Sequence, residues 1–306
     1  MNTQIPESIG QEVIAALRQS GDKTPLRDTQ ETIPGGVSET LLLKTDLNVY
    51  FLKWNEKPWF GTFTNEAFQL SLLRQTNTVT VPVVIGFAEA EQGQPAWMLQ
   101  EWAGTTTQDD AELRLGRKLG QRIAELHAAT SNTAPGYGYV ERNEDGSTQL
   151  PTQDWASFLY EAHLRHHIER ARKENRWTTE RNQRVDRLVE QLPNLLAGVR
   201  RAPTLLHGDL HSGNIRLAQN GEPVLVDPWL FYGDREIEIV STFLSGDFPP
   251  TFYASYNEIF PLEPDFQDRV DLYKLVWLLS GLYYSSEASS GEDNAIADPI
   301  LAHYVG

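Results

Sequence analysis

The chain has 306 residues, enough for one large domain or two smaller ones, and its 40% hydrophobic and 22% charged residues are typical of a globular protein. A net charge of −16 disfavours binding to nucleic acid or to an anionic membrane surface. The absence of cysteine excludes disulfides, zinc–thiolate sites and thiol nucleophiles. Because we find neither a basic leader with an apolar core nor an apolar run of about 18 residues, we expect a cytoplasmic protein.

The N-terminal third alternates between helical and strand-like patterns. Apolar residues recur at helical spacing over 5–20 and 64–75. Short runs rich in Leu, Val, Phe and Tyr, separated by turn residues, predict five strands at 30–34, 39–45, 48–54, 81–91 and 95–103. The order is a helix, three strands, a second helix and two strands.

Helical patterns dominate beyond a polar stretch at 104–110. We expect helices at 111–130, 154–173, 181–198, 234–246, 249–259 and 265–284, with small strands in an island at 203–228 and a mobile loop at 285–294. The sequence therefore predicts an α+β protein of two lobes. A five-stranded antiparallel N-terminal lobe would span 1–103, and a mainly helical lobe would span 104–306.

The most informative segment is LHGDLHSGNI at 206–215, a polar loop between apolar flanks. Asp209 and Asn214 have the Asp-x-x-x-x-Asn spacing of a kinase catalytic loop. Asp227 follows a strand-like Val-Leu-Val run, which would direct its carboxylate back at that loop. This combination favours phosphoryl transfer, which needs a group to accept the proton of a substrate hydroxyl and oxygen ligands to hold Mg²⁺ against the phosphates of ATP.

Lys53 lies in an expected strand where the apolar alternation predicts half-burial, and a buried lysine needs a partner. Glu66, in the following helix, is the natural one, and a strand–helix Lys–Glu pair positions the ATP phosphates in kinases. Gly35 and Gly36 separate the first two expected strands. They would let backbone N–H groups approach a phosphate, although an ordinary hairpin turn explains the same pair.

With these motifs the chain resembles the fructosamine kinase family. Its members are ketosamine kinases that share the protein-kinase-like fold with aminoglycoside and choline phosphotransferases. The resemblance covers roughly residues 5–305. Its motifs are IPGGVSET, VYFLKWN, MLQEWAG, LGQRIAELHAAT, QDWASFLYEAHL, HGDLHSGN and DPWLFYGDREIEIV.

The resemblance implies that Asp209 is the base and that Asn214 and Asp227 are Mg²⁺ ligands. It also implies that Lys53 and Glu66 position the ATP phosphates. Three residues would line the adenine, with backbone groups reading its edge: Gln100, Glu101 and Trp102. The implied reaction transfers the γ-phosphate of ATP to a sugar hydroxyl of a ketosamine of the fructosamine or ribulosamine type. The product is labile, so the sugar leaves and the amine is restored, which is a deglycation repair step.

The chain departs from the family pattern on the acceptor side. His211 stands where family members usually carry Trp, His163 where they carry Arg, and 149–151 where they carry Gln-x-Asn. These departures leave open a phosphotransferase for another hydroxylated amine, such as an aminoglycoside or an amino alcohol. A nucleotide-binding pseudoenzyme that regulates a partner is a further alternative, and the oligomeric state, monomer or homodimer, is also open.

Four residues are candidate substrate contacts: His211, Trp229, Asp234 and Glu236. Trp229 either stacks on a substrate or packs the segment after Asp227. One of Asp234 and Glu236 would receive a substrate ammonium while the other fixes the loop with Arg235; the alternative is an exposed surface pair. The helical spacing of His163, His166 and His167 predicts a solvated or substrate-facing helix surface rather than a metal site.

Overall fold

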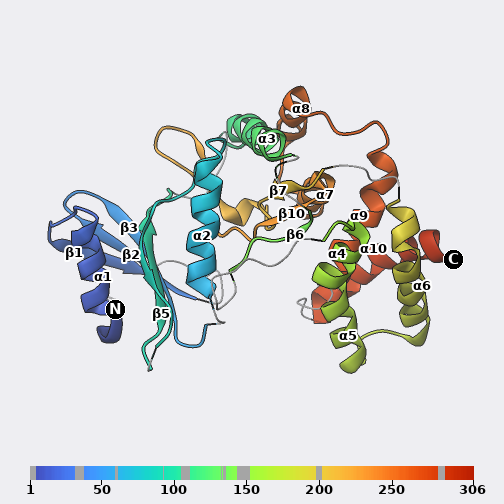
Figure 1. Cartoon of the computed structure of the whole chain (residues 1–306), viewed down its shortest axis with the longest axis horizontal. Coiled ribbons are helices and arrows are strands. Elements are labelled where there is room, and N and C mark those ends of the chain that lie inside the picture. The colour runs from blue at the N-terminus through green and yellow to red at the C-terminus, as the bar shows by residue number, and fades with distance from the viewer. Residues whose placement is uncertain are drawn as a thin grey trace.

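The computed structural model describes residues 5–31, 38–58, 61–91, 93–104, 111–131, 133, 136–142, 152–197, 202–281 and 287–306. Figure 1 shows a sheet with α1 and α2 on one side of the molecule and most of the helices on the other. The two-lobed α+β architecture predicted from the sequence is confirmed. No described helix has both the length and the apolar character needed to cross a membrane.

The N-terminal elements form one antiparallel sheet and two flanking helices. In chain order they are α1 (Glu7–Gln19), β1 (Leu26–Glu31), β2 (Glu39–Thr45), β3 (Val49–Asn55), α2 (Thr62–Gln75), β4 (Val84–Ala88) and β5 (Ala96–Glu101). The strand order is β1-β2-β3-β5-β4, with antiparallel pairing throughout. The first strand was predicted four residues too late at its start, because LRDTQE is a polar edge strand without apolar alternation.

The two faces of this sheet are covered by different helices, and the alternation of side chains along β3 decides which residues meet which helix. Leu52 pairs with Leu99 on the face that packs against α1. The next residue, Lys53, pairs with Met98, which packs against Phe63 and Ala67 of α2. The strand period therefore directs the Lys53 side chain toward α2.

The remaining elements are mostly helical. They are α3 (Ala111–Thr130), β6 (Gly138–Tyr139), α4 (Trp155–Phe158), the π-helical segment η1 (Leu159–Leu164), α5 (Arg165–Lys173), α6 (Thr179–Leu195), β7 (Thr204–Leu206), the 3-10 turn η2 (Ser212–Asn214), β8 (Ile215–Leu217), β9 (Pro223–Leu225), β10 (Phe231–Gly233), α7 (Arg235–Ser245), α8 (Pro250–Ile259), α9 (Gln267–Gly281) and α10 (Glu287–Val305). The short strands form a β6-β10-β7 sheet and a β8-β9 hairpin.

Two segments differ from the sequence-based expectation. The helix expected at 154–173 is a continuous helical run, but its centre, η1, is π-helical. The loop expected at 285–294 is wrong, because α10 begins at Glu287. The helix is anchored further along by Ala297, Leu301 and Val305, which recur every four residues and are buried.

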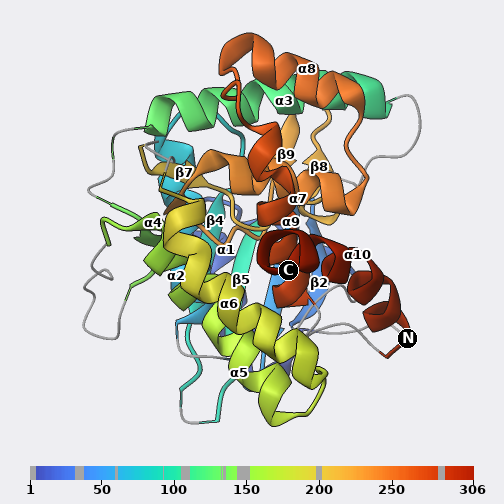
Figure 2. The same ribbon diagram turned by 90° about the vertical axis from the view of Figure 1, so that its right-hand side faces the viewer.

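Helices α3 and α8 lie side by side, as Figures 1 and 2 both show. Two glycines of α3 permit this approach. A Cβ on Gly116 would lie 2.3 Å from Cγ of Pro249, and a Cβ on Gly120 would lie 2.2 Å from the carbonyl oxygen of Phe252. The glycines thus bring α8 against α3, and with it the chain that joins α7 to α8.

Candidate active site

Lys53, Glu66 and Asp227 meet between β3, α2 and the segment after β9. Nζ of Lys53 lies 2.7 Å from Oε1 of Glu66 and also donates to Oδ1 of Asp227. Lys53 is 7% exposed, and burial alone would lower its pKa, but the two carboxylates raise the pKa above its ordinary value. The predicted Lys53–Glu66 pair therefore forms, and it also includes Asp227, which lies 174 residues further along the chain.

Asp209 and Asn214 face each other across the loop between β7 and β8. Nδ2 of Asn214 donates to Oδ2 of Asp209 at 2.8 Å and to its carbonyl oxygen at 2.9 Å. Both partners are acceptors, so the amide orientation is fixed and Oδ1 of Asn214 accepts no hydrogen bond from the described residues. The Asp209 carboxylate remains about half exposed, as a group that must meet a substrate has to be.

His211 lies next to this carboxylate and favours its charged form. Its Nε2 lies 3.6 Å from Oδ2 of Asp209, and its Nδ1 accepts from the Gly213 N–H at 3.0 Å. Burial acts to raise the pKa of Asp209, but His211, His207 and Asn214 hold that pKa below its ordinary value. Asp209 is therefore charged at neutral pH.

The two clusters are joined through the backbone. The N–H of Val226 donates to the carbonyl of Asn214 at 3.0 Å, and Nε2 of His207 contacts the carbonyl of Val226 at 3.1 Å. Asp227 has a left-handed backbone, φ +54°, which is uncommon for a residue with a side chain and turns the chain directly after β9. Asp209, Asn214 and Asp227, which the sequence predicted to act together, are thus held in one contiguous network.

The oxygen atoms of this network suit a divalent cation. Mg²⁺ is bound by carboxylate and amide oxygens, usually few from the protein, with the rest from phosphates and water. Oδ1 of Asn214 and the partly exposed carboxylate of Asp227 supply such donors. Among the described residues there is no cluster of three or more His, Asp or Glu with metal-binding geometry, so an ion here would need phosphate oxygens as further ligands.

A buried network that the sequence did not reveal supports the loop from behind. The N–H of Gly208 donates to Oε1 of Glu238 at 2.7 Å, and the other oxygen of Glu238 lies 2.9 Å from Nε2 of His127. Nδ1 of His127 lies 2.9 Å from the hydroxyl of Tyr256, which accepts from Nη1 of Arg235 at 3.0 Å. No local signal in the sequence connects His127 to Glu238, 111 residues away.

The segment expected to contact adenine is only partly available. Gln100 is 3% exposed, whereas Glu101 is exposed and Trp102 is half-buried, with its ring 5.9 Å from that of Phe51. The N–H groups of Glu101 and Trp102 donate to the carbonyls of Val83 and Val49. The edge of an adenine ring would therefore have to form hydrogen bonds with other backbone groups.

The predicted substrate contacts divide into two groups. His211 is partly exposed beside Asp209, and Trp229 is 50% exposed, with its ring 6.3 Å from that of Tyr139. Asp234 and Glu236 are both fully buried. The expectation that one of them receives a substrate ammonium, and the alternative of a surface pair, are therefore both wrong.

Internal partners explain why these two carboxylates are buried. Asp234 caps α7 through the Glu236 N–H and accepts from the Tyr273 hydroxyl at 2.6 Å. Glu236 forms a two-pronged pair with Arg269, at 2.7 and 3.1 Å. They fix the chain that follows Asp227, as had been expected for only one of them.

Of the remaining sequence candidates, His163 lies inside the protein, so the expectation of a solvated or substrate-facing position is wrong for this residue. Its Nε2 is buried without a hydrogen-bond partner among the described residues, and burial lowers the pKa of the ring to about 4. Its ring packs against Phe231, Phe158 and Tyr139, whereas His166 is exposed. Gly35, Gly36 and the segment 149–151 lie outside the described residues.

A two-lobed fold with a Lys–Glu pair in its sheet lobe and an Asp-x-x-x-x-Asn loop in its helical lobe is the arrangement of protein-kinase-like phosphotransferases. A solved structure from Haemophilus somnus, provisionally named fructosamine-3-kinase, matches with a TM-score of 0.77 and 24% identity over 94% of this chain and 95% of its own. Residues 10–301 match the fructosamine kinase family. The chain belongs to that family.

Two relatives agree with this placement. A probable ketoamine kinase of Enterococcus faecium is 33% identical over 281 residues, which cover 91% of this chain and 95% of the relative. A chloroplastic protein-ribulosamine 3-kinase of Oryza sativa subsp. japonica is 32% identical over 284 residues, which cover 88% of this chain and 79% of the relative.

Proposed function

We propose that the protein is an ATP-dependent kinase that phosphorylates a sugar hydroxyl of a ketosamine, the rearranged adduct of a sugar and an amine. The observation that carries this proposal is the family match over residues 10–301, in a chain that retains Lys53, Asp209, Asn214 and Asp227. The names of the relatives, ketoamine kinase and protein-ribulosamine 3-kinase, support the acceptor class. The labile phosphate would make the reaction a deglycation step, and we propose that it takes place in the cytoplasm.

Asp209 is the proposed base. Its carboxylate is charged and half exposed, and the Asn214 amide fixes its orientation, so it can accept the proton of the attacking hydroxyl. His211 and Trp229 lie on the acceptor side, where His211 would contact the substrate next to Asp209. A positioned base of this kind contributes about 10²–10⁴-fold to the rate.

Lys53 is the proposed ligand of the ATP phosphates, with Glu66 as its positioning partner. In the nucleotide complex the Lys53 ammonium would be shared between phosphate and Glu66, and Asp227 would be released toward the metal. Mg²⁺, when bound by Asn214 and Asp227, would neutralise charge on the phosphates. Gly35 and Gly36, which follow β1 in the sequence, would approach the phosphates.

The lobe boundary is proposed at 103/104, with residues 1–103 binding the nucleotide and 104–306 providing the catalytic and acceptor groups. The adenine would lie beside Gln100, Glu101 and Trp102, at the end of β5. The two alternatives are less well supported. The names of the relatives favour a ketosamine acceptor over another hydroxylated amine, and a pseudoenzyme would not need the complete catalytic set.

The test is acceptor selection by the unmodified chain. ATP consumption and phosphorylated product are measured against ribulosamine, fructosamine, erythrulosamine, an aminoglycoside and choline, each with Mg·ATP. We expect kcat/KM to be highest for a ketosamine and the product to release free amine on standing. Higher kcat/KM for the aminoglycoside or choline would refute the acceptor class, and ATP binding without turnover of any acceptor would favour the pseudoenzyme.

A further inference from the structure

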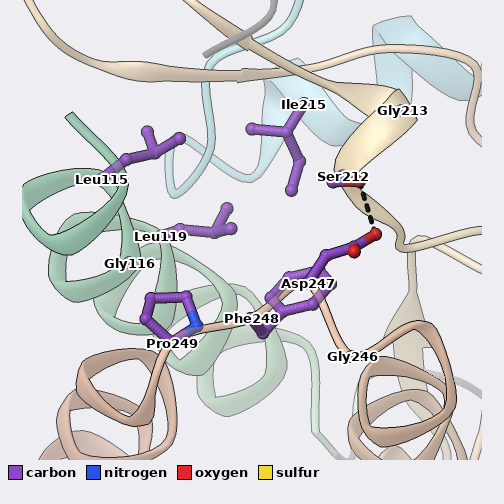
Figure 3. A pocket seen from close by; sticks show the side chains of 10 residues that line it. All are labelled: Leu115, Gly116, Leu119, Ser212, Gly213, Ile215, Gly246, Asp247, Phe248 and Pro249. Atoms are coloured by element: carbon purple, nitrogen blue, oxygen red, sulfur yellow. Dashed lines mark hydrogen bonds between the residues drawn. The ribbon is translucent and has the colours of Figure 1, made fainter. Parts of the chain in front are cut away.

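A cavity of about 460 Å³ lies beside the loop that carries Asp209, between α3, the loop from α7 to α8 and the turn η2. Figure 3 shows how its walls are arranged. Leu115, Leu119, Ile215 and Phe248 provide apolar walls, and Ser212 and Asp247 provide a polar edge. None of the roles proposed above uses this space.

Tight glycine contacts hold the walls of the cavity in place. Gly116 and Gly120 fix α8 and the preceding Pro249 directly against α3, so the lower wall cannot close by sliding without a clash. On the other side, a Cβ on Gly213 would lie 2.6 Å from the His211 ring. The cavity is therefore pre-formed, as small-molecule sites usually are.

The polar edge of the cavity is close to the reacting groups. Oγ of Ser212 donates to Oδ2 of Asp247 at 2.6 Å, and Asp247 is exposed, so its carboxylate can also meet a cation. Asp209 and Asp247 both act on the His211 ring, and each raises the pKa of that ring, Asp209 more strongly. His211, which lies beside Asp209, directly precedes Ser212 in the chain, so the proposed base and the cavity edge belong to one short loop.

The short stretch of chain between Asp209 and Ser212 allows one acceptor to span both places. Ser212 follows Asp209 by three residues, so even an extended chain would separate them by only about 11 Å, and the turn in which Asn214 N–H donates to His211 O at 2.9 Å shortens this. In a ketosamine the reacting sugar hydroxyl and the nitrogen are separated by about 5 Å, and the amine's own substituent extends beyond. An acceptor whose hydroxyl meets Asp209 can therefore reach the cavity with that substituent.

We propose that this cavity is the amine subsite, formed by Leu115, Leu119, Ser212, Ile215, Asp247 and Phe248, and that it binds the aliphatic stem on the ketosamine nitrogen while Asp247 pairs with the protonated nitrogen. The inference rests on the proposed function. The apolar walls match an alkyl stem, and the carboxylate matches the ammonium at its base. The net charge of −16 favours such a cation.

The test compares ketosamines made from one sugar with methylamine, ethylamine, propylamine and butylamine. Burying each further methylene in the amine subsite should raise kcat/KM about fourfold, from about 0.8 kcal/mol per group. Leu115→Trp, which fills the apolar part, should abolish this dependence on stem length while the methylamine adduct is still phosphorylated. Thermal unfolding of this variant checks that it folds.

A second variant tests the polar edge and does not depend on repacking. Asp247→Asn keeps an acceptor for Ser212 but removes the charge, so kcat/KM for every protonated ketosamine should fall about two- to fivefold. The matched control is Glu258→Gln on α8, an exposed carboxylate paired with Arg117 at 3.1 Å, which changes the net charge equally outside the cavity. The control should leave kcat/KM unchanged.

The outcomes separate the two levels of the proposal. Phosphorylation of all four ketosamines with equal kcat/KM, or equal effects of Asp247→Asn and Glu258→Gln, would overturn the amine subsite and leave the proposed function intact. A failure of the unmodified protein to phosphorylate any ketosamine would instead overturn the proposed function. A rising series that Leu115→Trp flattens and Asp247→Asn lowers would support the amine subsite.

Discussion

Replacing Glu238 by glutamine should destabilise the protein and misplace the catalytic loop. In the buried network behind that loop, Arg235 can only donate and the Glu238 carboxylate can only accept. The hydrogen bonds therefore all have the same direction: Arg235 donates to Tyr256, Tyr256 donates to His127, and His127 donates to Glu238. Glu238 also accepts from the Gly208 N–H. Every member of the chain has a partner, and both oxygens of Glu238 are in use, one for His127 and one for Gly208.

Glutamine keeps the shape of Glu238 but has one acceptor oxygen and one amide donor. If the oxygen serves Gly208, the amide faces the Nε2–H of His127. Moving that proton to Nδ1 only transfers the conflict to the Tyr256 hydroxyl. One buried donor is left without an acceptor, at about 1–3 kcal/mol, and the surviving bond loses its charge assistance, at about 1 kcal/mol more.

The expected loss of about 2–4 kcal/mol corresponds to a fall in Tm of roughly 3–6 °C in a chain of 306 residues. Differential scanning calorimetry measures it, with the exposed Glu258→Gln as the control, which should shift the Tm by no more than about 1 °C. Because Gly208 precedes Asp209, kcat should fall as well. A Tm for Glu238→Gln that matches the control would refute the one-directional network.

Three further results are expected. Lys53→Ala should reduce the rise in Tm that saturating Mg·ATP produces over the variant's own ligand-free Tm, because a ligand of the folded state stabilises it by mass action; an unchanged rise would remove Lys53 from the nucleotide site. Hydrogen bonds from Thr24, Thr45 and Tyr50 outweigh burial and hold the pKa of Asp22 to about 2, below its unfolded value. Asp22 therefore stabilises the fold above about pH 4, by up to about 2 kcal/mol, and this is lost as the pH falls through about 2. The unfolding free energies of the unmodified chain and Asp22→Asn should converge over that range in denaturant titrations, and a constant gap would contradict the carboxylate's role. Gly208→Ala should cost more than about 2 kcal/mol in the same titrations, because Gly208 has φ +82° and an added Cβ would lie 1.8 Å from the carbonyl oxygen of Trp229; a neutral substitution would show that the loop relaxes freely.

Features that depend on local periodicity could be predicted from the sequence. The helix at 111–130 has the predicted bounds, because its apolar repeat is regular and a polar stretch precedes it. The direction of Lys53 followed from strand alternation, and the relation of Asp209 to Asn214 from a spacing of five residues. In each case the physical cause lies within one element or one loop.

Features that depend on distant partners could not be predicted. Asp234 and Glu236 are hydrophilic residues at the start of a helix, and their burial is decided by Tyr273 and Arg269, which lie 39 and 33 residues further along. The cavity depends on the approach of α8 to α3. Two glycines of α3 permit this approach, but their presence in the sequence does not predict it. The π-helical turn in η1 likewise has no local sequence signature that separates it from an α-helix.

The most direct measurement is turnover by Asp209→Asn, compared side by side with Asp227→Ala, on a ketosamine that the unmodified protein phosphorylates. Asn at 209 preserves shape and hydrogen bonding but cannot accept the proton, so kcat should fall about 10²–10⁴-fold while Mg·ATP affinity is retained. Asp227→Ala should lose Mg·ATP affinity as well as turnover, because a metal ligand is removed. Undiminished kcat in Asp209→Asn would contradict the assignment of Asp209 as the base and, with it, the proposed phosphoryl transfer at this loop.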